Sequence, residues 1–124
     1  MTLSAEQIAA AKRTTTYRSE DEHHEHDDCI RLAYEWLDAQ VKTKGIGRTQ
    51  HPIKHYIETW AQRYVSTADV IVAASLHPDV RGRYPYFNIR SPAVRPHPRR
   101  LAGIGEAGKH KYERYKDVYS TDEA

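Results

Sequence analysis

Apolar residues recur at helical spacing in four stretches of the first 78 residues. Ser4 and Gln7 have the spacing of a capping box, and they predict a short first helix that ends before Thr14. A longer second helix is predicted from Ser19 to about Lys44, where two nearby glycines end the pattern. Two apolar stripes run side by side along this second helix, so we expect a wide face of it to be buried.

Two further helices are predicted between Pro52 and Pro78. Pro52 suits the first turn of the third helix, whose apolar residues continue at helical spacing to Tyr64. Ser66 and Asp69 form another capping pair, and the apolar run after them predicts a fourth helix that ends before Pro78. The predicted core combines apolar residues of the last three helices: Ile30, Ala33, Leu37, Ile53, Ile57, Trp60, Val70, Ala74 and Leu76.

The chain changes character after Pro78. Prolines and glycines interrupt every helical pattern there, and only Tyr84–Ile89 is predicted to be extended. A last helix over Glu106–Tyr119 has only the spacing of its tyrosines in its favour. We therefore expect an all-α or mainly α fold of about four helices. Its helical domain covers residues 1–78, and an irregular, basic, Pro/Arg-rich extension over residues 79–124 packs on that domain or projects from it.

The length of 124 residues fits a single core. Cys29 is the only cysteine, so a secreted scaffold held together by disulfides is excluded. The first residues lack the basic and apolar segments of a signal peptide, and no apolar run approaches the roughly 20 residues that span a bilayer. These features predict a cytoplasmic protein with no membrane contact.

Charge is strongly divided along the chain, although the formal net charge is only +2. Between Ser19 and Asp38 eight acidic residues stand against one arginine, which gives −7. Between His77 and Lys116 ten lysines and arginines stand against three acidic residues, which gives +7. This division predicts either an arm that binds a polyanion or an electrostatic contact between the two halves, within one chain or between copies.

The basic half combines arginine with aromatic residues, glycine and proline. Guanidinium groups pair with phosphates and with guanine edges, and aromatic rings stack on unpaired bases, so this composition favours nucleic acid as the partner. The predicted contact residues of the arm are Arg81, Arg83, Arg90, Arg95, Arg99 and Arg100. The alternative is that these arginines solubilise a loop or pair with the acidic helix of the same chain.

The third and fourth helices have the short connection of a helix-turn-helix. In that motif Ser66 and Thr67, at the start of the fourth helix, would approach a groove of DNA. The fourth helix lacks the Arg, Lys, Asn and Gln side chains that read bases. Packing of the two helices in a plain core is therefore the favoured interpretation.

A metal site is a weaker alternative, built on His23, His26 and Cys29. Imidazole and thiolate are zinc ligands, but a fourth ligand would have to come from elsewhere, such as His51 or His55. Neighbouring carboxylates and the lack of a second paired motif make the pattern unspecific, so we expect no metal and no cofactor. The sequence has no nucleophile motif and no phosphate-binding loop, and it leans against an enzyme.

The leading hypothesis is a small nucleic-acid-binding accessory or regulatory protein, with DNA favoured over RNA and a homodimer expected. Small proteins carried by phages and plasmids offer an analogy only. The main alternative is a protein-interaction module or inhibitor, because nine tyrosines and two tryptophans suit half-buried positions on a charge-divided surface. A metal-dependent enzyme is the third class. The expected partners are thus nucleic acid and a second copy of the chain, with another protein as the alternative.

Overall fold

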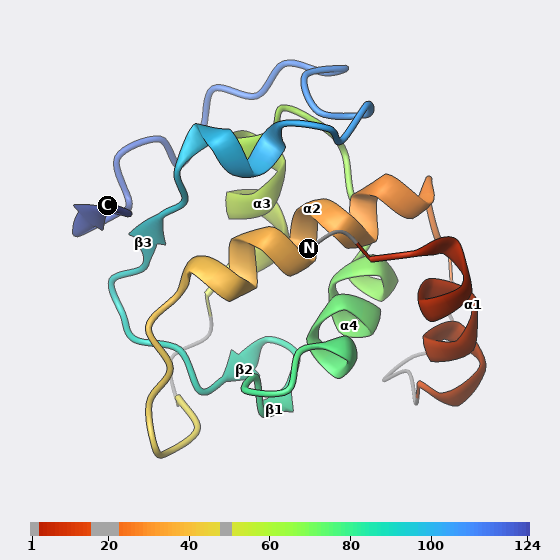
Figure 1. Cartoon of the computed structure of the whole chain (residues 1–124). Helices are drawn as coiled ribbons and strands as arrows, with labels where there is room; N and C mark the ends of the chain where they lie inside the picture. The colour runs from red at the N-terminus through yellow and green to blue at the C-terminus, as the bar shows by residue number, and fades with distance from the viewer. Residues whose placement is uncertain (1–2, 16–22, 48–50) are drawn as a thin grey trace.

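The computed structural model describes residues 3–15, 23–47 and 51–124. Four α-helices, four two-residue strands and one 3₁₀-helix make up its regular structure (Figure 1). In chain order they are α1 (Ala5–Thr14), α2 (Asp27–Ala39), α3 (Ile53–Ala61), α4 (Thr67–Leu76), β1 (Gly82–Arg83), β2 (Tyr86–Phe87), β3 (Val94–Arg95), η1 (Pro98–Leu101) and β4 (Thr121–Asp122). The protein is therefore a small, mainly helical domain, as the sequence predicted.

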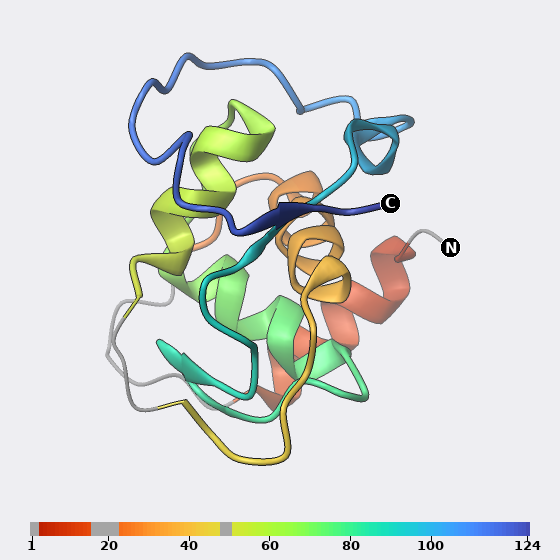
Figure 2. The ribbon, with the colours of Figure 1, turned by 90° about the vertical axis from the view of Figure 1, so that its left-hand side faces the viewer.

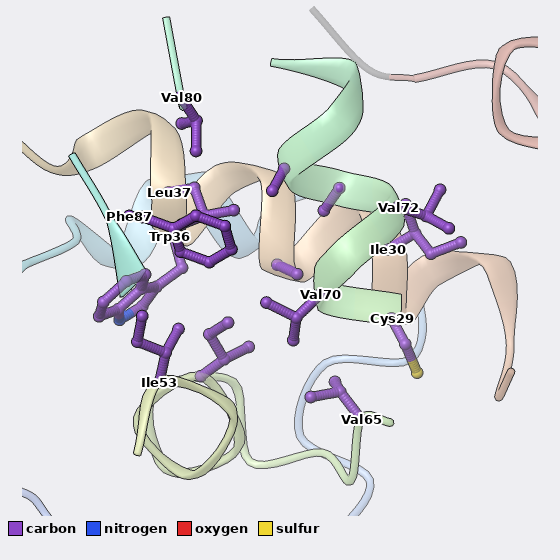
Figure 3. Packing of buried hydrophobic residues seen from close by; sticks show 14 of the residues in the cluster. Cys29, Ile30, Trp36, Leu37, Ile53, Val65, Val70, Val72, Val80 and Phe87 are labelled. Atoms are coloured by element: carbon purple, nitrogen blue, oxygen red, sulfur yellow. The ribbon is translucent and has the colours of Figure 1, made fainter. Parts of the chain in front are cut away.

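The core forms around α2, which runs through the middle of the molecule (Figure 1). α4 and α3 pack against it, and α1 packs on α4. Figure 3 shows side chains of α2, α3 and α4 meeting in this interior, among them Ile30, Ile53 and Val70. Seven of the nine predicted core residues are buried, whereas Trp60 and Leu76 are partly exposed and pack on the edge of the core.

Local capping patterns start two helices where they were predicted. The hydroxyl of Ser4 accepts a hydrogen bond from the backbone N–H of Gln7 at 3.1 Å, and the Gln7 side chain accepts one from Ser4 at 2.8 Å. The capping box predicted at the start of α4 forms in the same way. α3 ends at Ala61 rather than Tyr64, because Gln62 adopts a left-handed conformation with φ 52°.

α2 is shorter than the sequence predicted. Residues 19–22 of the predicted helix lie outside the described residues, but residues 23–26 are not helical and α2 begins at Asp27 with His26 as its cap, so the predicted start is too early. The last helical residue is Ala39 rather than Lys44. The reason is non-local, because residues 41–47 hydrogen-bond to residues 87–90 instead of continuing the helix. Tertiary pairing thus overrides a helical pattern that continued in the sequence.

The chain after α4 packs on the helices through several of its own apolar residues. Val80, Phe87 and Ala93 are buried in the same cluster as the helical core residues. β1 and β2 form an antiparallel hairpin in which Gly82 faces Phe87, whereas β3 and β4 pair in parallel. The C-terminal strand β4 therefore lies beside β3, which comes from the middle of the second half of the sequence.

The helix predicted over Glu106–Tyr119 is wrong. The structure describes this whole segment as turns, bends and irregular backbone. Gly108 and Tyr115 have φ angles of 83° and 63°, which are left-handed and break a right-handed helix. Among the described helices, none is both long and apolar enough to cross a bilayer.

Different segments of the chain form the two opposite ends of the molecule (Figures 1 and 2). In both views the loop 41–47 and the β1–β2 hairpin lie at one end, below α2. Residues 98–117 lie at the opposite end, above α2. Cations carried by these two segments therefore belong to different surfaces.

Candidate nucleic-acid interface

Carboxylates of the acidic segment pair with cations inside the molecule. Asp27 of α2 accepts a hydrogen bond from Lys12 of α1 at 3.1 Å. Asp28 lies one turn before Arg31, which donates to it at 2.6 Å. The charge division seen in the sequence is therefore partly relieved within one chain.

Arg100 joins three carboxylates from distant segments. Its guanidinium donates to Glu35 and Asp38 of α2 at 2.9 Å each, and to both oxygens of Glu123 at 2.7 and 2.6 Å. Hydrogen bonding to Arg100 lowers the pKa of Glu123 from 4.5 to about 2, and the same bonds raise the pKa of Arg100 above its ordinary value. This predicted contact residue is thus occupied by internal ion pairs that fasten the C-terminal end to α2.

Arg95 and Arg99 are exposed, but their guanidinium groups contact the last residues of the chain. Arg95 lies 3.3 Å from Asp122 and 5.4 Å from the ring centre of Tyr119. Arg99 donates to the carbonyl oxygen of Ala124 at 3.2 Å. The structure therefore groups the last three predicted arginines around the C-terminal strand.

Arg81, Arg83 and Arg90 lie elsewhere, on a segment without carboxylates. We call residues 41–47 and 81–90 the basic ribbon, since backbone hydrogen bonds join the two stretches side by side. Lys42 turns inward and donates to three carbonyl oxygens at the end of α2, between 2.7 and 2.9 Å. The exposed cations of the ribbon, none of them ion-paired to a described residue, are Lys44, Arg81, Arg83 and Arg90.

Buried polar contacts hold the ribbon in shape. The side chain of Asn88 is buried, accepts a hydrogen bond from the backbone of Arg81 at 2.6 Å and donates one to the carbonyl of Thr43 at 3.3 Å. Gly82 has a φ of 103°, and a Cβ atom there would collide with the carbonyl oxygen of Tyr86. Because the backbone is fixed in this way, the ribbon loses little conformational freedom when a ligand binds.

The start of α4 faces the interior of the protein. Ser66 is buried as the cap of the helix, and Asp69 is fully buried beside His24, at 2.8 Å, and the backbone N–H of Glu25, at 3.3 Å. Of the two predicted contact residues only Thr67 is exposed. A recognition helix needs an exposed face at its N-terminal end. Six of the ten residues of α4 are instead buried, so this helix serves the core.

The three candidate metal ligands, His23, His26 and Cys29, each contact a different group of the protein. His26 caps α2, with its Nδ1 accepting from the backbone of Asp28 at 2.9 Å. The buried thiol of Cys29 donates to the carbonyl of Tyr64 at 3.4 Å, and burial raises the pKa of this thiol to about 12. His23 pairs with Glu25. No group of three or more His, Cys, Asp or Glu in the described part of the chain is placed to hold a metal ion.

Sequence reasoning missed two residues of the basic ribbon. Lys44 lies at the end of the predicted second helix, although the glycines on its C-terminal side indicate a loop. Asn88 stands between Phe87 and Ile89, and a single amide in an apolar stretch is a signal for a buried side chain that hydrogen-bonds backbone groups. Neither Lys44 nor Asn88 belongs to a recognisable binding motif in the sequence.

Comparisons of the chain with known protein families, curated proteins and solved structures found no match.

Proposed function

We propose that the protein binds nucleic acid through the basic ribbon, with Arg81, Arg83 and Arg90 on the phosphate backbone. One observation supports this above all others: the ribbon has four exposed cations and no carboxylate of its own. Elsewhere Arg100 is neutralised by its own chain. Cations that have no ion-pair partner and lie on a rigid surface attract a polyanion and release its counterions on binding.

The proposed contact is mainly with phosphates. Guanidinium groups form paired hydrogen bonds with phosphate oxygens, and Lys44 adds a point charge beside Arg81. The Arg81 guanidinium is held by the carbonyl oxygens of Thr43 and Lys44, at 3.3 and 2.6 Å, and keeps further donors for a ligand. Phosphate contacts of this kind position a strand and carry no sequence information by themselves.

Fluorescence anisotropy with labelled DNA across a salt series tests the proposal. The double variant Arg83→Ala, Arg90→Ala is expected to bind more weakly and to reduce the magnitude of the slope of log affinity against log salt by about 1.4 to 1.8, since each phosphate contact contributes about 0.7 to 0.9. The matched control is Lys109→Ala, Lys111→Ala, which removes two exposed cations at the opposite end of the molecule. Equal losses in both double variants, or no binding by the wild type at low salt, would refute the proposal.

The finer expectations from the sequence belong to this proposal as predictions. Replacing the DNA by RNA of the same sequence in the anisotropy assay tests the preference for DNA. Light scattering tests the expected dimer through the molar mass in solution. A regulatory or accessory role in the cytoplasm remains a prediction.

A further inference from the structure

A cavity of about 240 Å³ opens next to Arg90 at one end of the basic ribbon. Its walls come from segments far apart in the sequence: α2, the first turns of α3, the stretch after β2, and the C-terminal tail. This volume is below the roughly 300 to 1,000 Å³ typical of pockets for drug-sized ligands. The main wall residues are Trp36, Ile53, Tyr56, Ile89 and Pro92.

The aromatic walls of the cavity are held in place by contacts behind them. Trp36 is fully buried, and its indole N–H donates to the hydroxyl of Tyr119 at 3.0 Å. The ring of Tyr56 lies 6.3 Å from that of Trp36 and 6.4 Å from that of Tyr119, measured between ring centres. Figure 3 shows Trp36 next to Ile53, where α2 meets α3. A planar ligand would therefore meet the partly exposed ring of Tyr56, which the fully buried Trp36 holds in place from behind.

Polar groups line part of this cavity together with the apolar walls. Arg90, Ser91 and His51 belong to the lining, and the first two are exposed. The backbone of Arg90 is fixed because its N–H donates to the carbonyl of Val41 at 2.8 Å. The guanidinium of Arg90 has no ion-pair partner among the described residues. An apolar cavity beside a free cation suits a flat ring that carries an anionic group.

We infer that this cavity holds one unpaired nucleobase while Arg90 binds the adjoining phosphate. The inference rests on the proposed function and specifies the ligand as single-stranded nucleic acid. Aromatic and apolar walls favour the faces of a base, and Ser91 and His51 offer hydrogen-bonding groups to its edge. A base in a duplex is stacked and paired, so it reaches the cavity only if it is flipped out at a cost in free energy.

Binding of a single strand, a duplex of equal length and a mononucleotide tests this inference. The single strand is expected to bind at least about fivefold more tightly than the duplex, since stacking of one base on aromatic groups changes affinity by roughly 5- to 150-fold. A single strand with 2-aminopurine as the probe base reports on stacking through a change in its fluorescence. A mononucleotide that binds as tightly as the strand would overturn the assignment to strands.

Ser91→Phe is the variant aimed at the cavity, because the new ring fills it from an exposed position. We expect weaker binding of the single strand, loss of the 2-aminopurine signal and an unchanged melting temperature. Ala102→Phe places the same side chain on an exposed residue outside this cavity and is the control. If Ser91→Phe binds single strands as tightly as the wild type, the proposed base site is wrong, whereas the proposal for the basic ribbon is unaffected. No binding of any probe at low salt overturns both.

Discussion

The ion pairs between Arg100 and Glu123 lead to a prediction about stability. Glu123 accepts two hydrogen bonds from Arg100, at 2.6 and 2.7 Å, and a third from the backbone N–H of His97 at 2.8 Å. The substitution Glu123→Gln keeps the size of the side chain and one acceptor, but it removes the charge that Arg100 meets. We expect the variant to fold and to be less stable at neutral pH.

The expected loss follows from the pKa of Glu123. A carboxyl whose pKa falls from 4.5 in the unfolded chain to about 2 in the folded protein adds at most roughly 3 kcal/mol to the free energy of unfolding at pH 7. The pair is partly exposed, with 17% and 19% of the two side chains accessible, so solvent screening reduces the expected loss to about 1 to 2 kcal/mol. The stabilisation is fully present above pH 4.5 and is lost as the pH falls toward 2.

Urea unfolding followed by tryptophan fluorescence measures this difference at a series of pH values. At pH 7 Glu123→Gln should unfold at a lower urea concentration than the wild type, and the two curves should converge between pH 4.5 and 2. Glu113→Gln is the control, since Glu113 forms an ion pair with Lys116 at an exposed site, where removal costs little. A difference that persists at pH 2, or equal effects of both variants at pH 7, would show that the reasoning is wrong.

Three further substitutions or treatments test the fold. Gly82→Ala forces a Cβ against the carbonyl of Tyr86 in a left-handed conformation, so we expect a loss of about 1 to 3 kcal/mol in thermal unfolding, together with weaker binding of DNA. Asp69→Ala leaves the backbone N–H of Ser66 without its acceptor at 3.0 Å, and chemical denaturation should report a loss of about 2 to 4 kcal/mol. Because burial raises the pKa of Cys29 to about 12, a thiol reagent should modify this residue only after urea unfolds the protein; rapid reaction in the native state would contradict its burial.

Local signals allowed much of the helical part of the fold to be predicted. The capping box of Ser4 and the capping box of Ser66 depend on residues three positions apart, so the sequence alone contains them. The end of α2 at Ala39 depends on pairing between residues 41–47 and 87–90, and no local pattern contains that information. The tyrosines spaced like a helix after Glu106 instead pack as single rings, for example Tyr115 on Tyr56 with ring centres 5.3 Å apart.

The candidate site could be predicted only as a set of residue types. Arginine with aromatic residues indicated nucleic acid, but the sequence could not distinguish Arg90 from Arg100. That distinction arises because the tail brings Glu123 to α2, where Arg100 lies between three carboxylates. The cavity beside Arg90 needs Trp36 and Tyr56 from different helices, so it also depends on tertiary structure.

The separation of the arginines changes the salt dependence that the sequence suggests. Six predicted contact arginines would give a slope of roughly −4 to −5 on a single strand or a duplex, since each phosphate contact contributes about 0.7 to 0.9. The basic ribbon offers Arg81, Arg83, Arg90 and Lys44, so the same rule gives a slope between roughly −3 and −4. Arg95 contacts Asp122 and Arg99 contacts the carbonyl oxygen of Ala124, so we expect these two cations to add little to the binding of a ligand on the ribbon. Substituting Arg95 and Arg99 should therefore leave the slope unchanged. If the wild-type slope is steeper than the ribbon alone predicts, and becomes shallower when Arg95 and Arg99 are replaced, the contact lies at the C-terminal strand.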